Sequence, residues 1–579
     1  MSADPTVHPR QRRTGVSRLL PLLGWWPDYT ARVLRADLFA GLTVGVMLVP
    51  QAMAYASLAG MPPAAGLYAA VVPVVVYALL GSSATLAVGP VAIISLMAAA
   101  TLAPLADGDP NRYAALAAVL ALMVGALQLL MGLLRLGAVV NFLSHPVLSG
   151  FTSAAAIVIA ASQVADLLGL DAERSKTLPE AVTEATAALA TAHGPTIAVA
   201  AGSVLALVLL KRFLPRVPGA LVVVAGVTAL STVLVLRENG VAVLGHVPGG
   251  LPAPSLPDIN VGDLVALAPS ALAIALVGYL EGIAVAKSLA ARVRRTVSPD
   301  GELVAVGGAN LTAGLFGAFP VAGGFSRSAV NFSAGARTPV ASLITAAVVA
   351  LTALFLTPLF HDLPKAVLAA IIVVAVASLV DVRGALRTWR TRRSDGLALT
   401  ATFLVTLLAG VEAGIGAGVA FSLAAFLWHT SRPHIAELGM EPDTGVFLNL
   451  TRYQGLRRTP GVKILRVDAP LYFANAERVK DALLKAAQGE GVQTLVLDAS
   501  GIGACDSDCA HALADLDRAL TARGVVLRVA TVRGPVRDVL ARDGLWARWY
   551  EHERIHPDTA SAVSASVTDT EHTRTQDLP

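Results

Sequence analysis

The chain has 579 residues, of which 55% are hydrophobic and only 15% are charged. Because soluble proteins average about 25% charged residues and rarely expose large apolar patches, this composition excludes an ordinary soluble protein. The net charge is only +4, and the Lys and Arg residues gather between apolar stretches, a pattern that indicates membrane topology rather than nucleic-acid binding.

Fourteen apolar segments are predicted before residue 431, judged against the ~20 residues that cross a bilayer. They fall at 38–58, 63–80, 84–104, 113–135, 142–168, 195–213, 217–236, 262–288, 302–320, 325–335, 337–358, 364–381, 395–411 and 413–430. The stretch 171–193 is predicted to be a short surface helix, because Glu180 and Glu184 interrupt it. We therefore expect an N-terminal segment at 1–36 and a transmembrane domain at 37–431.

The orientation of the segments follows from the basic residues, which are enriched in cytoplasmic loops. Clusters follow the sixth, eighth and twelfth segments: Lys211, Arg212 and Arg216; Lys287, Arg292, Arg294 and Arg295; Arg383, Arg387, Arg390, Arg392 and Arg393. Four further arginines precede the first segment: Arg10, Arg12, Arg13 and Arg18. We expect a multi-pass protein of the inner (plasma) membrane with both termini in the cytoplasm.

The third and tenth segments are interrupted by Val88-Gly89-Pro90 and by Gly323-Gly324-Phe325-Ser326. Similar interruptions seven segments apart predict two seven-span repeats of opposite orientation. An interrupted helix has free N–H groups and about half a positive charge at its N-terminus, so two such ends at the midplane would form an anion site. Two ordinary glycine kinks are the alternative.

Glu281 and Arg327 are ionisable residues within or beside apolar segments. An acid inside a span costs about 3 kcal/mol on insertion scales, so it is kept where it is paired, protonated or functional. Arginine binds oxyanions and can also neutralise a buried carboxylate. We interpret Glu281 as a proton carrier and Arg327 as an anion ligand. A purely structural Glu281–Arg327 pair, or a Glu281 at the headgroups, are the alternatives.

Four neutral side chains complete the set of candidate anion ligands derived from the residues alone. Gln51 and Tyr55 lie one turn apart on the first segment, and Ser326 and Ser328 flank Arg327. Their amide, phenol and hydroxyl groups can donate hydrogen bonds to an anion without adding charge. They could equally connect helices or bond to their own backbone.

The C-terminal part, 432–555, has the pattern of a soluble α/β domain. Strands are predicted at 462–467, 493–498 and 525–531, and helices at 475–488, 509–522 and 534–543. Asp506 and Ser507 would cap the second helix; a nucleotide-binding or phosphate-accepting turn is the less favoured alternative. Cys505 and Cys509 lack metal-site partners, and we expect them to be reduced thiols. The polar tail at 556–579 is predicted to be disordered.

Several stretches resemble the SulP family of sulfate transporters. Asp37–Ala56 is similar to the opening signature of that family, Gly81–Ala92 to its third helix, and Gly324–Pro339 to its tenth-helix motif, which is long and specific. Residues from about 462 to 555 resemble its STAS domain.

This resemblance implies a polytopic α-helical fold of fourteen transmembrane helices in a 7+7 inverted repeat, followed by the STAS domain. It further implies a core domain (segments 1–4 and 8–11) that moves against a gate domain (5–7 and 12–14) like an elevator, and a homodimer. The anion would lie between the N-termini of segments three and ten, lined by Gln51, Tyr55, Val88, Phe325, Ser326 and Arg327.

The coupling ion is also suggested by the resemblance. Tyr279–Ser288, which contains Glu281, is similar to the proton-coupled sulfate members. Bicarbonate members place a sodium-binding aspartate and threonine where this chain has Glu281 and Val285, so sodium coupling is disfavoured. We expect no cofactor, no metal and no enzymatic activity.

Together these observations predict proton-coupled uptake of sulfate. The alternatives are a bicarbonate or dicarboxylate transporter of the same family, an uncoupled anion channel and a nucleobase permease, which the Phe325-Ser-Arg motif and the C-terminal domain disfavour. In a further reading, the C-terminal domain is a cytoplasmic module that binds a regulatory partner and the membrane part anchors it.

Overall fold

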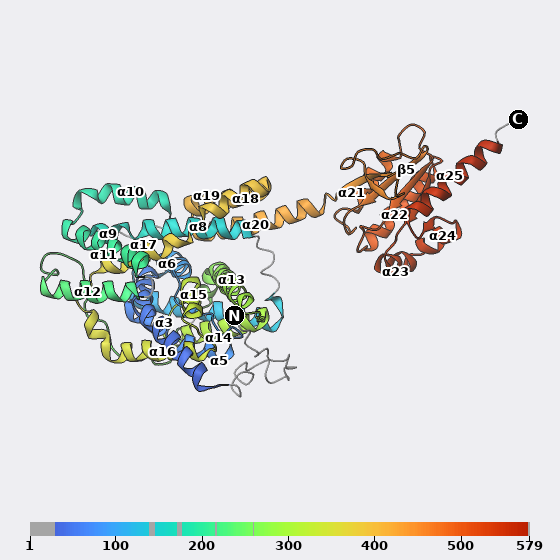
Figure 1. Ribbon diagram of the computed structural model, residues 1–579. Coiled ribbons are helices and arrows are strands. Elements are labelled where there is room, and N and C mark those ends of the chain that lie inside the picture. Colours follow the sequence, from blue (N-terminus) through green and yellow to red (C-terminus); the bar gives the residue numbers. More distant parts are fainter. Residues whose placement is uncertain (1–28, 138–144, 171–176, 215–216, 259, 577–579) are drawn as a thin grey trace. The chain divides into compact units, whose positions relative to one another are not determined.

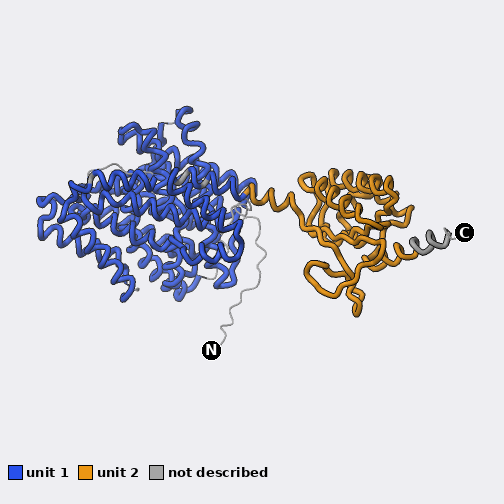
Figure 2. The backbone as a smooth tube through the Cα atoms, turned by 90° about the horizontal axis from the view of Figure 1, so that it is seen from above, with its two compact units in different colours: residues 1–422 blue, residues 423–579 orange. Residues whose placement is uncertain are grey.

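The computed structural model describes residues 29–137, 145–170, 177–214, 217–258 and 260–576. The chain forms two compact units, residues 1–422 and 423–579 (Figure 2). Each unit has its own hydrophobic core. The division falls within helix α20, before the boundary predicted at 431. Of the predicted N-terminal segment, residues 1–28 with their four arginines lie outside the described residues.

The first unit is built from helices, coloured blue to yellow in Figure 1. They are α3 (Ala31–Leu58), α4 (Pro63–Ala69), α5 (Val72–Leu80), α6 (Ala92–Ala106), α7 (Pro110–Leu133), α8 (His145–Ser162), α9 (Val164–Leu168), α10 (Leu178–Ala188), α11 (Gly194–Phe213), α12 (Gly219–Val233), α13 (Val261–Arg292), α14 (Pro299–Leu315), α15 (Phe325–Ser333), α16 (Val340–Leu351), α17 (Lys365–Val376), α18 (Val382–Thr391), α19 (Arg393–Ala409) and α20 (Val411–Thr430). The short turns η3 (Leu189–Thr191), η4 (Thr352–Leu356), η5 (Thr357–Phe360) and η6 (Ala377–Leu379) extend them.

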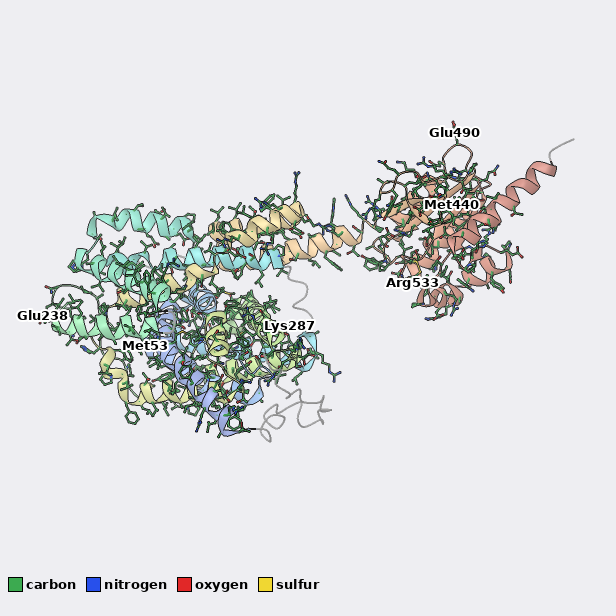
Figure 3. All side chains as sticks on the ribbon, in the orientation of Figure 1. Met53, Glu238, Lys287, Met440, Glu490 and Arg533 are labelled. Carbon is green, nitrogen blue, oxygen red and sulfur yellow. A yellow bond between two sulfur atoms is a disulfide. The ribbon has the colours of Figure 1, made fainter. Side chains whose placement is uncertain are left out.

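Each of the fourteen predicted segments corresponds to one or two of these helices, and α10 is the predicted short helix. Within the described residues, eight helical stretches are long and apolar enough to cross a membrane. Three shorter apolar helices accompany them, at Ala92–Ala106, Gly219–Val233 and Gly416–Thr430. Apolar side chains within the helices are buried and charged ones near helix ends are exposed: Met53 on α3 is fully buried, whereas Lys287 near the end of α13 is exposed (Figure 3).

Side-chain caps define where several long helices begin. Thr30, Asp109, Asn260 and Ser298 precede α3, α7, α13 and α14, and each accepts a hydrogen bond from an N–H of the first turn. Such caps stabilise a helix start by about 1 kcal/mol. The two short helices α6 and α15 differ, because neither has a side-chain cap in the structure.

Two short strands interrupt the helical unit at the predicted positions. Strand β1 (Val88–Gly89) pairs antiparallel with β2 (Ala322–Gly323), with Val88 opposite Gly323. Helices α6 and α15 begin directly after these strands. The nine residues of α15 rise only about 14 Å, less than half the hydrocarbon thickness of a bilayer. The kink alternative is therefore wrong, because the backbone leaves the helical conformation altogether.

The second unit is a six-stranded sheet with helices, drawn in orange and red in Figure 1. Its strands are β3 (Ile435–Met440), β4 (Phe447–Asn449), β5 (Val462–Val467), β6 (Thr494–Asp498), β7 (Val526–Ala530) and β8 (Ile555–His556), in the order β4-β3-β5-β6-β7-β8. Strands β5 to β8 are parallel, and β3 and β4 join antiparallel. Its helices are α21 (Ala476–Ala486), α22 (Ser507–Thr521), α23 (Gly534–Arg542), α24 (Leu545–Glu551) and α25 (Thr559–Gln576).

Two predictions for the second unit were wrong. Of the tail predicted to be disordered, 556–579, residues Thr559–Gln576 form α25, because Ala562 and Val563 cover a small apolar face of the sheet that includes Ile464 and Val496; residues 577–579 lie outside the described residues. The polar composition of the tail conceals this short apolar face. The cysteines form a disulfide, Cys505–Cys509: four residues apart at the start of α22, their Cα atoms lie 5.6 Å apart, within the range that a disulfide spans.

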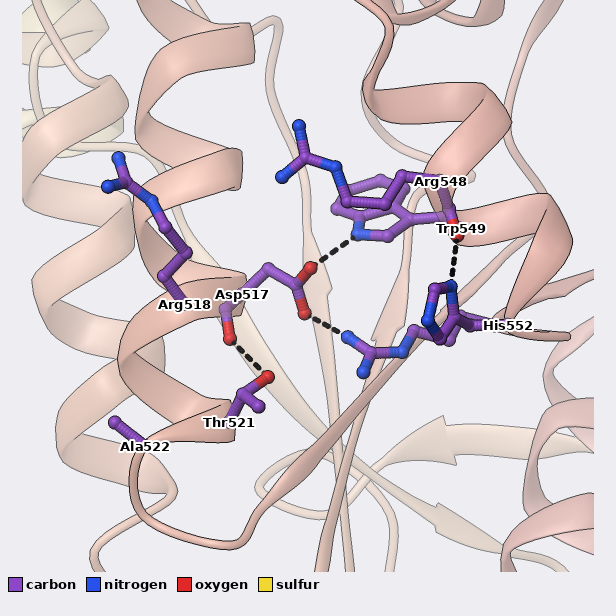
Figure 4. A pocket seen from close by; sticks show the side chains of 8 residues that line it. Asp517, Arg518, Thr521, Ala522, Arg548, Trp549 and His552 are labelled. Carbon is purple, nitrogen blue, oxygen red and sulfur yellow. Dashed lines mark hydrogen bonds and ion pairs between the residues drawn. The ribbon is translucent and has the colours of Figure 1, made fainter.

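A pocket of about 430 Å³ lies on the second unit (Figure 4). At its base Asp517, which is 5% exposed, accepts a hydrogen bond of 3.0 Å from Trp549 Nε1 and forms an ion pair with Arg554. These contacts connect α22 to α24 and to the strand that follows. Arg518 beside them is largely exposed and pairs with Asp515 instead.

We predict different costs for removing these two aspartates. Asp517→Ala leaves Arg554 and the Trp549 N–H half-buried or buried without a partner, and should lower the free energy of unfolding of the second unit by about 3 kcal/mol. Asp515→Ala removes an exposed pair and should cost less than about 1 kcal/mol. Urea denaturation of the second unit measures both values, and equal effects would contradict the prediction.

Candidate anion-binding site

The site forms where the two interrupted helices begin. The pairing of β1 with β2 brings the starts of α6 and α15 together, and Gly324 N donates to Ala87 O at 3.0 Å. The first N–H groups of a helix have no acceptor within the helix and carry partial positive charge. Since no side chain caps either start within the described chain, both helix ends can attract an anion.

Arg327 occupies the third position of α15 and connects the two helix starts. Its side chain is only 2% exposed, and Nη1 donates to Pro90 O at 2.5 Å. The Nε and Nη2 groups are buried and have no hydrogen-bond partner among the residues that the structure describes. Leaving buried donors unsatisfied costs about 1–3 kcal/mol each, and more when they are charged. The guanidinium therefore presents two charged donors that an oxyanion can accept from.

Glycines give the guanidinium its room. A Cβ atom on Gly89 would lie 3.4 Å from Arg327 Nη2, and one on Gly324 would lie 2.9 Å from it. The first distance is tight and the second is shorter than real contacts allow, so a side chain at Gly324 would displace the guanidinium. The glycines that break the helices are thus also the residues that let Arg327 fit between them.

Glu281 reaches the site because α13 packs closely against β2. A Cβ atom on Gly282 would lie 3.6 Å from Gly323 N, and one on Gly278 would lie 3.2 Å from Ala322 Cβ. One carboxylate oxygen of Glu281, Oε2, is buried without a hydrogen-bond partner. Its charge interacts with that of Arg327, but no ion pair or hydrogen bond joins the two in the described part of the chain. A structural role for the two charges, without contact to an anion, stays the alternative.

Helix α3 contributes the neutral groups. Gln51 and Tyr55 are 8% and 7% exposed, and α3 contacts both α6 and α15. The Gln51 Oε1 atom is buried without a partner among the described residues, and Tyr55 lies near enough to Arg327 and Glu281 for a charge on its phenol to be affected by theirs. Gln51, Tyr55, Glu281 and Arg327, which are up to 276 positions apart in the sequence, therefore belong to one region.

The remaining candidates differ in accessibility. Val88 is buried in β1, whereas Phe325 and Ser326, the first two residues of α15, are exposed. Ser328 already has two partners: its hydroxyl donates to Gly324 O at 2.6 Å and accepts from Ala87 N at 2.9 Å. The Ser328 hydroxyl thus holds α15 to the segment before β1, and a direct contact with the anion stays a prediction.

Two polar residues that were not predicted lie on the same two helices. Asn331, one turn after Arg327, donates to Thr85 O at 3.1 Å, and its Oδ1 is buried without a partner in the described structure. Ser95 on α6 is fully buried, and its hydroxyl is likewise unpaired. Asn331 could have been found from the sequence, since it follows Arg327 by four positions and so shares its helix face. Ser95 has no predicted site residue at such a spacing.

Known proteins match this chain over nearly its whole length. Residues 34–402 match the model of the sulfate permease family, and residues 453–562 match that of the STAS domain. The chain belongs to the sulfate permease family. It is therefore a multi-pass membrane protein of a family of anion transporters, and the predicted SulP relationship is confirmed.

Two relatives illustrate the match. A Mycobacterium tuberculosis protein named as a probable sulfate transporter is 40% identical over 525 residues, which cover 89% of this chain and 94% of that protein. The chloroplastic sulfate transporter 4.1 of Arabidopsis thaliana is 37% identical over 554 residues, which cover 92% and 80% of the two chains.

Solved structures confirm the predicted fold class. The murine solute carrier 26 family member A9, an anion transporter in the inward-facing state, superposes with a TM-score of 0.90 at 25% identity, over 98% of this chain and 96% of that chain. The transmembrane domain of the cyanobacterial bicarbonate transporter BicA matches with a TM-score of 0.60 at 27% identity, over 67% and 99%. Both comparisons include the helical unit that holds the candidate site.

We predict that anion binding needs the guanidinium group of Arg327 and not only its positive charge. Arg327→Ala removes the charge, and Arg327→Lys retains it but replaces the planar fork of five N–H donors by a single ammonium group. Both should weaken anion affinity about 100-fold, which corresponds to ~2.7 kcal/mol.

Thermal stabilisation of the purified protein by titrated oxyanions measures this affinity. Arg32→Ala, at the exposed start of α3, is the control and should leave the affinity unchanged. An Arg327→Ala protein with unchanged affinity would remove Arg327 from the site, whereas unchanged affinity in Arg327→Lys alone would show that a positive charge suffices there.

Proposed function

We propose that the protein takes up sulfate, or a similar oxyanion, together with protons. The observation that carries this proposal is the buried Arg327 guanidinium, whose Nε and Nη2 groups have no partner in the described residues and lie between two uncapped helix starts. The relatives named as sulfate transporters support the choice of sulfate.

The chemistry of the site suits a tetrahedral oxyanion. Two guanidinium N–H groups and the first N–H groups of α6 and α15 can donate to different oxygens of one ligand. Gln51, Tyr55 and Ser326 would add neutral donors, and Val88 and Phe325 would form apolar walls that limit access of water. In a low-dielectric region these fixed donors bind charge more strongly than water-exposed ones do.

Charge arithmetic supports coupling to protons. Each negative charge that enters a cell against 100 mV costs about 2.3 kcal/mol, so a sulfate dianion costs about 4.6 kcal/mol. One proton leaves a net charge of −1, and a second makes the step electroneutral. Glu281 would carry a proton, because an unpaired buried carboxylate is costly to keep charged. Glu281 and Val285 stand where sodium-dependent members would supply an aspartate and a threonine, which supports protons over sodium.

For the transport cycle we propose an elevator in which a core domain moves against a gate domain. The core would comprise α3–α7 and α13–α16, which would surround the site, and the gate would comprise α8–α12 and α17–α20.

We further propose that the protein is a homodimer in the plasma membrane with both termini in the cytoplasm. Its STAS domain would bind a regulatory partner. Bicarbonate or dicarboxylate uptake and an uncoupled anion pathway are the competing functions at the same site.

We predict that Glu281→Gln separates binding from coupling. Glutamine keeps the size of the side chain but cannot carry a proton, so the variant should still exchange sulfate across the membrane but should not accumulate it under a pH gradient. Uptake of radiolabelled sulfate into proteoliposomes, acidic outside and with the membrane potential clamped, measures this difference.

The controls for this experiment test the alternatives. A sodium gradient without a pH gradient should not drive accumulation in the original protein, and excess bicarbonate or dicarboxylate should compete only weakly. Accumulation by the Glu281→Gln protein under the pH gradient would contradict the proton role. Currents without stoichiometric proton flux would favour the uncoupled pathway.

A further inference from the structure

Helix α14 lies backbone to backbone against α7. Cβ atoms on Gly125, Gly307 and Gly314 would lie 2.5 Å from Leu311 N, 2.7 Å from Leu129 N and 2.6 Å from Ala118 O. Such distances are too short for any side chain, so these three positions require glycine. Close approach through small residues is how transmembrane helices gain rigid packing. Helix α14 is therefore a firm support within the first unit.

From its N-terminal end, α14 holds the segment that leads into β1. The carboxylate of Glu302 is 1% exposed and accepts four hydrogen bonds: from Ser82 N (2.8 Å), Ser82 Oγ (2.7 Å), Ser83 N (2.9 Å) and Tyr77 OH (2.8 Å). Two of these donors are backbone groups of the turn itself. The negative charge also lies in the first turns of α14, where the helix dipole favours it.

Further hydrogen bonds connect Ser83 to the residues that precede β1 and to α15. Ser83 Oγ accepts from Leu86 N at 3.2 Å, and Ala87 N donates to Ser328 Oγ at 2.9 Å. Val88 of β1 follows directly. The position of β1, and with it the start of α6, is thus tied to the carboxylate of Glu302.

Eight residues further along, α14 holds the segment that leads into β2. Asn310 is fully buried, and its amide binds Val321 from both sides: Oδ1 accepts from Val321 N at 2.7 Å, and Nδ2 donates to Val321 O at 3.0 Å. Nδ2 also donates to Gln128 Oε1 at 2.9 Å, and Gln128 Nε2 donates to Ala275 O at 3.0 Å. This network joins β2 to α7 and to α13, the helix that carries Glu281.

We propose that Glu302 and Asn310 are positioning residues that hold the two helix starts of the anion site in binding geometry without touching the anion. Each secures one strand of the β1–β2 pair to the same helix, α14, which α7 supports in turn. The transport readout of this proposal rests on the proposed function, whereas its structural readout does not.

A competing role for Glu302 is that of a second proton carrier. The pattern of donors argues against it, because both oxygens are satisfied by hydrogen bonds that require acceptors, two of them from backbone N–H groups. Glu302→Gln separates the two roles. Its Oε1 can still accept from Ser82 and Ser83, and its amide can donate to the Tyr77 oxygen, but it cannot carry a proton.

The structural test is hydrogen–deuterium exchange of the full-length protein in nanodiscs. Glu302→Ala should raise the exchange rate of the peptide spanning 82–90 about tenfold, and Asn310→Ala that of the peptide spanning 319–324, because each change removes the hydrogen bonds that hold the segment. Glu302→Gln should stay within about twofold of the original protein. Unchanged exchange in both alanine variants would overturn the proposal.

The transport test separates positioning from proton carriage. Glu302→Ala should raise the KM for sulfate about tenfold because displaced donors bind the anion less well, while Glu302→Gln should keep both KM and pH-driven accumulation. Loss of accumulation in Glu302→Gln with unchanged exchange rates would identify a proton carrier and overturn the positioning role.

A milder variant and the exchange comparison cover the two ways in which these experiments could fail. If an alanine variant fails to fold in size-exclusion chromatography, Ser82→Ala is the milder change. It removes the hydroxyl that donates to Glu302 and accepts from Ser298 N, while the Ser82 and Ser83 N–H donors remain. It should raise exchange at 82–90 and KM about two- to threefold; no effect on either would count against the proposal. If the original protein transports no sulfate, the proposed function fails, and the exchange comparison still decides the role of Glu302 and Asn310.

Discussion

The antiparallel pairing of β1 with β2 is the interaction on which the candidate anion site of the first unit depends. Val88 opposite Gly323, and Gly89 opposite Ala322, are the whole of the pairing, yet they satisfy backbone groups where two helices are broken. Unsatisfied backbone groups cost several kcal/mol in a membrane interior. The pairing makes it tolerable to leave the starts of α6 and α15 uncapped, and those uncapped starts are what can attract an anion.

The other residues of the site either hold the two strands together or are positioned by them. Arg327 joins the two helix starts through Pro90 O, and Ser328 joins α15 to the segment before β1. Glycines at 89 and 324 leave space for the guanidinium, and glycines at 278 and 282 let α13 approach β2. Close backbone contacts at these glycines therefore set the distances between β1, β2, α13 and α15. The unpaired groups of Arg327 and Glu281 lie among these closely packed segments.

Much of the site could be predicted from local sequence. The break at Val88-Gly89-Pro90 and that at Gly323-Gly324 are visible because glycine and proline end helices whatever their surroundings. Glu281 and Arg327 stand out because ionisable residues are rare in apolar segments. The predicted disorder of 556–579 failed for the opposite reason. A polar composition dominates a local interpretation, whereas the burial of Ala562 and Val563 depends on Ile464, Val496 and Ala530, which belong to three separate strands earlier in the chain.

The order of the apolar segments, the two breaks and the α/β unit could be predicted from local sequence, because these depend on hydropathy, periodicity and residues that end helices. Which polar groups are paired is visible only in the folded chain. Ser328 and Glu302 have partners 241 and 220 residues away, whereas Arg327 and Glu281 retain buried atoms without any in the described residues. Pairing is a property of contacts between distant segments, so the folded chain alone separates residues that support the site from residues that are free to bind.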